Sequence, residues 1–359
     1  MEERKRILNM VKEGKLTVDE ALNLLELLES GLQKQEGELS TTVHFEEAKK
    51  EDTVHQKVHS AKDKLFDFVD TAFKKIKDFD LDLNFGQSIE VSHIFHHTDV
   101  FLKDMDIDVA NGSVKIVPWD QKDVRIECQA KVYRVENQDK ARQNFLKDVH
   151  FTIEGGKMRF HIQQKWMKVD AVIFVPQIDY DRVRARIFNG PISGEKLHAT
   201  DLKVKAANGK MNLAELVGKK MEAETVNGHI NIINSQFDEI EAETINGPIQ
   251  LGGDFQKVEM QSFNGDLSAS LSGNRCENLL AKATTGSIDV YIPEGIAVSG
   301  ELKTNFGSFN VLLDGIQITE EKNEMIQKLL RFKSDHPSLI LSADTKTGSV
   351  TVHKLDGAK

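Results

Sequence analysis

Two stretches of the sequence, MEAETVNGHINI at residues 221–232 and IEAETINGPIQL at residues 240–251, are close copies of one another. In both, an Asn-Gly pair lies between segments in which apolar and polar side chains alternate. Such pairs begin at Asn189, Asn208, Asn227, Asn246 and Asn264, with spacings of 19, 19, 19 and 18 residues. Gly286 and Gly307 continue the series, and further copies stand at Asn111-Gly112 and Thr347-Gly348. A repeat of this length predicts one supersecondary unit that is stacked many times.

The alternation predicts short strands, each with one face buried. Residues six and four positions before each Asn are apolar, and so are those three positions after it. Asn-Gly pairs also form type I′ hairpin turns, so an antiparallel meander is an alternative. A β-solenoid accounts better for the recurrence of one residue class at each position, because its coils stack equivalent positions about 4.8 Å apart. We predict a mainly β chain in which residues 86–359 form a β-solenoid, with helical insertions near residues 138–149 and 320–332.

The beginning of the chain is predicted to be helical. In residues 1–32, Gly14 ends a first helix and the segment 17–20 is a capping box for a second one. About 30 residues bury too little surface to be robust alone, so this hairpin is expected to dock on a protein partner or on a second copy of itself. The apolar face consists of Ile7, Leu8, Val11, Leu24, Leu25 and Leu28. Residues 33–85 predict a polar linker followed by an amphipathic helix.

Composition restricts the partners and the compartment. The 359 residues include 47 Lys and Arg against 57 Asp and Glu, and the net charge of −10 argues against nucleic acid as a partner. The sequence has neither a signal peptide's apolar stretch nor a run long enough to span a membrane. We expect a cytoplasmic protein, peripheral to the inner membrane face if it meets a membrane; export to the cell surface without a signal peptide is the alternative. The two cysteines, Cys128 and Cys276, are predicted to be buried thiols.

Motifs for catalysis, cofactors and metals are missing from the sequence. The glycines occur once per repeat and form no phosphate-binding loop, and there is no GxSxG nucleophile motif. His93, His96 and His97 have a spacing that suits a metal only if they are helical, and no Cys or carboxylate is placed to complete the site. We therefore predict surface histidines, no catalytic residues, no cofactor and no metal.

The outward positions carry a candidate binding surface. Five and three residues before the Asn, the charge changes from basic to acidic along the repeats, and the acidic part consists of Glu222, Glu224, Glu241, Glu243 and Glu259. Carboxylates stacked this closely raise one another's pKa or attract cations, so we predict a strip for a cationic peptide or divalent ion. The alternative is a solvated face, offset in part by Lys203 and Lys205.

A second outward position is unusual. The residue just before the Asn is apolar at Phe188, Val226, Ile245 and Phe263. Either the corner rotates these side chains inward, or they form an apolar stripe for a partner.

The opening EERKRILNMVKEGKLTVDEALNLLELLES, the junction FKKIKDFDLDLNFG, the segment NGSVKIVPWD and the Asn-Gly repeats together resemble the family of Firmicutes proteins that includes LiaX and YvlB. The resemblance implies a SHOCT-like hairpin, a helical connector and an adhesin-type repeat domain folded as a right-handed, single-stranded β-helix. It also implies a non-enzymatic scaffold or regulator of the cell-envelope stress response and of the response to antimicrobial peptides. A membrane protein of that system is then an expected partner, and homo-oligomers are expected as well. The alternative is an adhesin-like surface protein that binds a cationic peptide or a carbohydrate.

Overall fold

The computed structural model describes residues 87–324 and 327–355, and these residues are mainly β. They contain 22 strands and one α-helix, α4 (Gln138–Asp148), which lies where a helical insertion is predicted. The hairpin of residues 1–32, the connector of residues 33–85 and the face formed by Ile7, Leu8, Val11, Leu24, Leu25 and Leu28 lie outside the described residues. Within the described ranges, no helix is both long and apolar enough to cross a membrane.

Successive repeats pair side by side as parallel strands. Asn227 is in register with Asn208 on one side and with Asn246 on the other, so equivalent positions 19 residues apart become neighbours. The Asn-Gly pairs therefore do not form hairpin turns. Each is a corner at which the chain leaves one row of strands and enters another, and this stacking of coils is the arrangement that the recurring residue classes predict.

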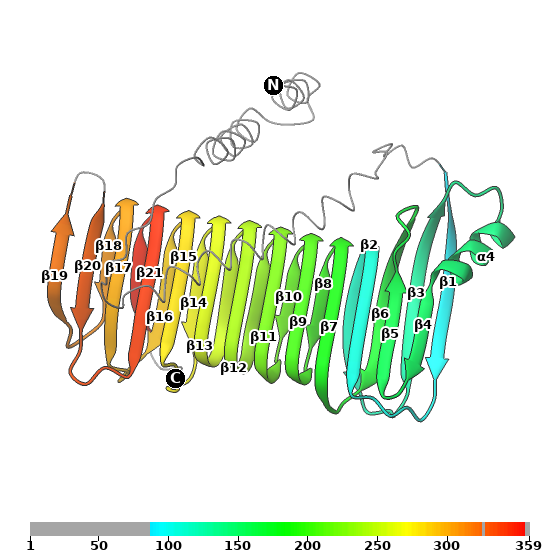
Figure 1. Cartoon of the computed structure of the whole chain (residues 1–359), viewed down its shortest axis with the longest axis horizontal. Helices are drawn as coiled ribbons and strands as arrows, with labels where there is room; N and C mark the ends of the chain where they lie inside the picture. Colours follow the sequence, from blue (N-terminus) through cyan, green and yellow to red (C-terminus); the bar gives the residue numbers. More distant parts are fainter. Residues whose placement is uncertain (1–86, 325–326, 356–359) are drawn as a thin grey trace, which may run out of the picture. The chain divides into compact units, whose positions relative to one another are not determined.

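Every coil contributes one strand to each of two rows (Figure 1). In spatial order, row one contains β4 (His150–Glu154), β5 (Lys157–Ile162), the first half of β2 (Asp104–Trp119), β7 (Asp179–Asn189), β9 (His198–Asn208), β11 (Val217–Asn227), the second halves of β12 (Ile230–Asn246) and β13 (Ile249–Asn264), β15 (Asn278–Thr285), β21 (Leu339–Thr347), β17 (Val298–Phe306), β20 (Lys328–Lys333) and β19 (Gln317–Asn323).

Row two follows the same order on the other side of the corners. It contains β1 (Ser88–His97), β3 (Val124–Tyr133), β6 (Met167–Pro176), the second half of β2, β8 (Ile192–Glu195), β10 (Met211–Ala214), the first halves of β12 and β13, β14 (Leu267–Leu271), β16 (Ile288–Pro293), β22 (Val350–Leu355) and β18 (Phe309–Leu312).

The core lies between the two rows. The predicted inward positions are buried: Met221 and Ala223 in row one, and Ile230 and Ile232 in row two, are all 0% exposed. They belong to one cluster that runs from Val91 to Val352. Small side chains such as Ala223 alternate with larger ones such as Met221, which lets two rows of side chains fill a thin interior.

The corners are held by two kinds of contact between neighbouring coils. The amide of Asn227 donates to Asn208 at 2.9 Å, and the amide of Asn246 donates to Asn227 at 2.8 Å, so the Asn side chains form a ladder. Beside it, the backbone N–H of Gly228 donates to the carbonyl of Asn246 at 2.9 Å. A Cβ atom on Gly228 would overlap the carbonyl oxygen of Gly209. Glycine is required here because the next backbone occupies the space of a side chain.

The coils do not stack in the order of the sequence. At the carboxyl end, β21 lies between β15 and β17, and β22 lies between β16 and β18. Figure 1 shows the red β21 between the yellow β15 and the orange β17. The other end has the same arrangement, since β2 lies between β5 and β7, although β5 and β7 belong to consecutive coils. At both ends a coil that is distant in sequence is thus inserted between two consecutive coils.

The predicted helix at residues 320–332 is wrong. Its described residues belong to the antiparallel hairpin of β19 and β20, and β20 pairs with β17. Leu330 and Phe332 alternate inward with a period of two, and the Phe332 ring fills the space above Gly300, its partner in register. The exposed hydrogen-bonding edge of β17 favours a strand here, because a helix would leave that edge unpaired.

The helix α4 covers the opposite end of the stack. The side chain of Asn137 caps it by accepting from the N–H of Lys140 at 2.9 Å. Ala141 and Phe145 are buried against β1 and β3, whereas Leu146 is 42% exposed. The helix therefore covers the core at this end of the stack.

The corner contact can be tested with two glycines of neighbouring coils. Gly228→Ala places a methyl group on the carbonyl of Gly209, whereas Gly252→Ala meets no atom closer than 3.9 Å. We expect Gly228→Ala to lower the free energy of unfolding by at least about 2 kcal/mol and to lower the urea midpoint. Gly252→Ala should stay within about 0.5 kcal/mol of the wild type. Equal effects of the two substitutions would contradict the steric account.

The inserted coil can be tested by removing residues 334–359. β17 then loses its parallel neighbour β21 and keeps only β20. We expect the amides of residues 298–306 to exchange hydrogen much faster in the shortened chain, and trypsin to cleave after Lys303. If the coils stacked in sequence order, β17 would stay paired with β15, and its protection would not change.

Candidate functional site

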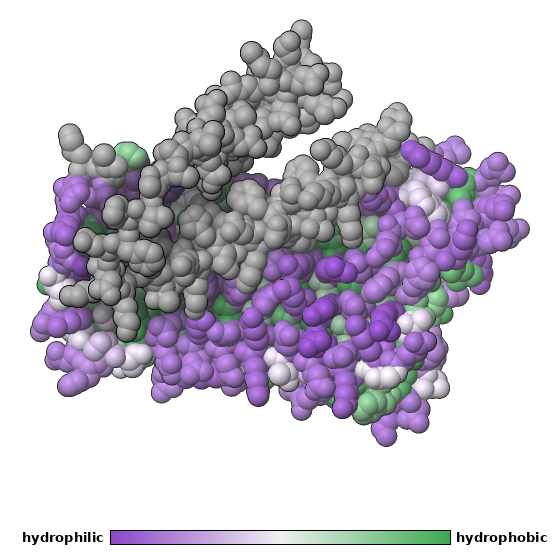
Figure 2. All heavy atoms as spheres, viewed as in Figure 1, coloured by the Kyte–Doolittle hydropathy of each residue, from purple (hydrophilic) through white to green (hydrophobic). Residues whose placement is uncertain are grey.

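The outer face of row one brings the predicted acidic residues together. Glu222, Glu241 and Glu259 occupy matching positions of three adjacent strands, and Glu224 pairs in register with Glu243. We call these five residues the acidic strip. Four of them are partly exposed, and Glu243 is 5% exposed. In the view of Figure 2 the surface of the described residues is largely hydrophilic, with small apolar areas.

Lysines lie next to the acidic strip, on the neighbouring strand β9 and on β11 itself. Lys203 forms an ion pair with Glu222, and Lys205 forms one with Glu224. Lys220, two residues before Glu222 on the same strand, lies 2.8 Å from the Glu222 carboxylate. Burial raises the pKa of Glu222, but the hydrogen bonds and charges of Lys203 and Lys220 outweigh it and bring the pKa down to about 2. The neighbouring lysines therefore have a larger effect on the pKa of Glu222 than the other carboxylates of the acidic strip do.

A second charged column was not singled out by the sequence analysis. Seven residues before each Asn, the signs alternate from coil to coil through Arg182, Asp201, Lys220, Glu239 and Lys257. Arg182 lies 3.7 Å from Asp201, and Lys257 lies 2.6 Å from Glu239. The sequence could have predicted these ion pairs, because the two residues of each pair are one repeat apart and so occupy equivalent positions of adjacent coils. Opposite charges in adjacent strands favour this register.

An apolar column borders the acidic strip on the same face. The pairing between neighbouring strands is interrupted at the residue just before each Asn, at Val226 for example, and the register is the same on either side of the interruption. Phe188, Val226 and Ile245 are half-buried, and Phe263 is 45% exposed. These side chains are not turned into the core, which favours the apolar stripe over the inward rotation. We call Val226, Ile245 and Phe263, which lie in the same three coils as the acidic strip, the apolar column.

The predicted histidines and cysteines lie apart. His93 and His97 are on one side of β1 and His96 is on the other, because β1 is a strand. Among the residues that the structure describes, no group of three or more His, Cys, Asp and Glu side chains is arranged to hold a metal ion. Cys128 and Cys276 are buried free thiols, as predicted, and burial raises the pKa of each to about 12.

Comparison with known proteins gives matches for both parts of the chain. A family model described as Toastrack DUF4097 matches residues 102–353, and a SHOCT-like domain model matches residues 2–33. The uncharacterised protein YvlB of Bacillus subtilis (strain 168) is 45% identical over an alignment of 359 positions, and the match covers 97% of this chain and 98% of the relative.

Solved structures with low sequence identity also resemble the chain. A candidate adhesin from Bacteroides fragilis NCTC 9343 is 11% identical, with a TM-score of 0.40, and the match covers 73% of this chain and 97% of that one. A candidate lipid-binding protein from Parabacteroides distasonis ATCC 8503 is also 11% identical, with a TM-score of 0.36, and the match covers 74% and 97%.

The charge balance at Glu222 predicts a pH dependence. Because its pKa falls from 4.5 to about 2 on folding, the ionised carboxylate stabilises the protein above pH about 4.5, and this contribution is lost as the pH falls toward 2. We expect Glu222→Gln to have a lower thermal midpoint than the wild type above pH 4.5, and the gap to close between about pH 4.5 and pH 2. In a Lys203→Met, Lys220→Met background the gap above pH 4.5 should be smaller, because the lysines that stabilise the Glu222 carboxylate are gone. A gap that stays constant down to pH 2 would show that the lysines do not lower the pKa.

Proposed function

This chain belongs to the Toastrack DUF4097 family, as a YvlB-like protein, and we propose that it is a non-enzymatic scaffold that binds cationic amphipathic peptides in the cell-envelope stress response. The coils serve as the binding surface, and the hairpin of residues 1–32 recruits a protein partner or a second copy. The family resemblance supports the stress-response role, and the outer face of row one supports the ligand class.

One observation carries the choice of ligand: the acidic strip and the apolar column lie side by side on the same three coils. Glu222 and Glu224 precede Val226 on β11, Glu241 and Glu243 precede Ile245 on β12, and Glu259 precedes Phe263 on β13. Neighbouring strands are about 4.8 Å apart, so the carboxylates form one band and the apolar side chains form a parallel one.

A cationic amphipathic peptide matches both bands. Its Lys or Arg side chains meet the acidic strip, while its apolar side covers Val226, Ile245 and Phe263. Acidic side chains alone would attract any cation, but the adjacent apolar column favours a ligand that also has an apolar face to bury. A divalent ion makes no use of that column, and we therefore prefer the peptide.

The remaining parts of the proposal rest on the sequence. The face of Ile7, Leu8, Val11, Leu24, Leu25 and Leu28 docks on a membrane protein of the stress system or on a second copy of the hairpin. The protein then acts in the cytoplasm, at the inner face of the membrane. We also propose that the coils wind right-handed, as nearly all parallel crossover connections do.

Titration with a synthetic amphipathic peptide of Lys and Leu tests the proposal. The variant Glu222→Gln, Glu224→Gln, Glu241→Gln, Glu243→Gln keeps the side-chain shapes and removes four charges. We expect it to bind the peptide at least about tenfold more weakly than the wild type, which is about 1.4 kcal/mol. Phe263→Ser should also weaken binding, because it removes part of the apolar column.

A matched control separates the acidic strip from net charge. The variant Glu277→Gln, Asp289→Asn, Glu294→Gln, Asp314→Asn also removes four negative charges, but at positions outside the acidic strip. It should bind the peptide with the wild-type affinity. Calorimetry or fluorescence anisotropy measures both variants, and circular dichroism checks their folding. Unchanged affinity in the strip variant, or an equal loss in the control, would rule out the acidic strip as the binding site.

A further inference from the structure

An open hollow lies on the outer face of row two, at the end of the stack that α4 covers. It measures about 490 Å³ and is lined by Ile94 and His96 of β1, Trp119 of β2, Asp120, Gln121 and Asp123 of the β2–β3 loop, and Arg125 of β3. Its size is in the range of small-ligand sites. The hollow and the acidic strip are on different rows, so the hollow is independent of the peptide surface.

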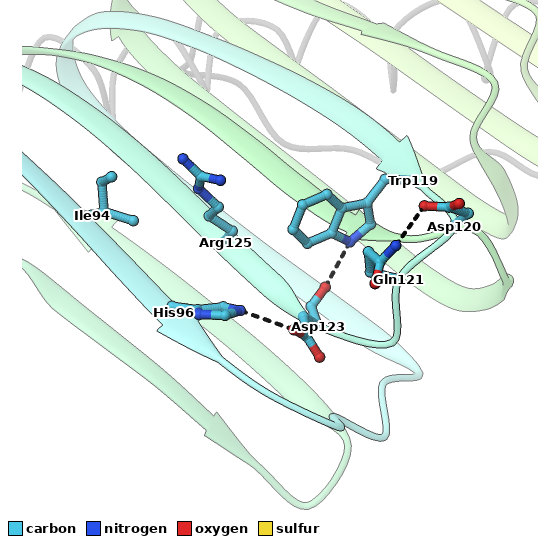
Figure 3. A pocket seen from close by; sticks show the side chains of 7 residues that line it. All are labelled: Ile94, His96, Trp119, Asp120, Gln121, Asp123 and Arg125. Atoms are coloured by element: carbon cyan, nitrogen blue, oxygen red, sulfur yellow. Dashed lines mark hydrogen bonds and ion pairs between the residues drawn. The ribbon is translucent and has the colours of Figure 1, made fainter.

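An indole ring held in place forms one wall of the hollow. Trp119 Nε1 donates a hydrogen bond to the carbonyl of Asp123 at 2.8 Å, and the ring packs against Phe174 with a centroid distance of 5.3 Å. Figure 3 shows the indole between Arg125 on one side and Gln121 on the other. Ile94, which is 53% exposed, adds a further apolar side chain. The ring is therefore fixed by its edge, and a flat apolar ligand face can stack on it.

Polar side chains surround the ring, and each carboxylate or guanidinium among them has a hydrogen-bonding or charged partner. His96 Nε2 lies 3.0 Å from Asp123, and the other Asp123 oxygen accepts from the N–H of Asp99 at 3.0 Å. Arg125 pairs with Glu127 at 2.5 Å, and Gln121 donates to Asp120 at 2.9 Å. Because each charge in this group faces an opposite charge or a donor, the wall favours a neutral ligand over an ion.

We propose that this hollow binds a short neutral saccharide, which stacks one sugar face on Trp119 and exchanges hydrogen bonds with Asp120, Gln121 and Arg125. A pyranose ring has an apolar C–H face and a rim of hydroxyl groups, and both features find a counterpart here. Carboxylate, amide and guanidinium groups are planar donors and acceptors that pair with adjacent hydroxyls. A nucleotide would also stack on the indole, but its phosphates would lie beside Asp120 and Asp123, which repel them.

Tryptophan fluorescence provides a direct test. The chain contains two tryptophans, Trp119 and Trp166, so the variant Trp166→Phe leaves Trp119 as the single indole reporter. We expect cellotriose, maltotriose or chitotriose to change its emission in a saturable way, with little dependence on salt because the ligand is neutral.

Two further variants in this background locate the binding. Asp120→Ala, Gln121→Ala removes two exposed side chains from the rim without touching the core, and Lys122→Ala changes an exposed residue of the same loop that does not line the hollow. We expect the first variant to bind at least about tenfold more weakly and the second to bind as the parent does.

The proposal is overturned if none of the three saccharides changes the emission up to about 10 mM, tenfold above a dissociation constant of about 1 mM. It is also overturned if inorganic phosphate gives the same saturable change, which would indicate an anion site, or if the rim variant binds as tightly as Lys122→Ala. Since peptide binding is measured with different residues on row one, failure of either proposal leaves the other one intact.

Discussion

The close approach of one corner glycine to the next is the contact on which the rest of the structure depends. The carbonyl oxygen of Gly209 occupies the space of a side chain at Gly228, and that of Gly228 does the same at Gly247. The Asn ladder and the backbone hydrogen bonds beside it then fix the corners to one another. Because these contacts hold equivalent residues of neighbouring corners next to each other, the strands before and after each corner stay in register. The two rows can then share one thin core.

In-register stacking also determines the surface. A parallel strand pair places equivalent positions next to each other, so any residue class that recurs in the repeat becomes a continuous column. Columns of Val, Ile, Leu and Ala stabilise the interior, whereas an outward column of Glu gathers like charges that the fold must tolerate. Lys203 and Lys220 compensate Glu222, and the alternating column from Arg182 to Lys257 shows a charge pattern without this conflict. A column of like charges beside an apolar column is thus a feature that stability alone does not require, which is why we propose that it binds a ligand.

Each end of the stack is completed by elements that are not parallel coils. At one end β1, β3 and α4 cover the last parallel strands, and at the other the β19–β20 hairpin lies against β17. The inserted coils pair on both sides: β2 pairs with β5 and β7, and β21 pairs with β15 and β17. Each inserted coil is therefore held between two others and cannot detach by itself.

The sequence by itself determined the repeat unit, the buried positions, the parallel stacking and the proximity of Glu222, Glu241 and Glu259. Each of these follows from the repeat length of about 19 residues and from the alternation of apolar and polar side chains. It also placed α4, but it misassigned residues 320–332, where apolar side chains fit a helical spacing as well as the strand spacing seen at Leu330 and Phe332. Only the tertiary structure decided the order of the coils and the hollow around Trp119. The physical reason is that all coils present the same class of surface to their neighbours, so periodicity defines the unit but not which unit lies beside it. The hollow is lined by residues 94–125 of three consecutive strands, and which of their side chains meet depends on the pairing of β1 with β3 and of β2 with β6, which no repeat pattern predicts.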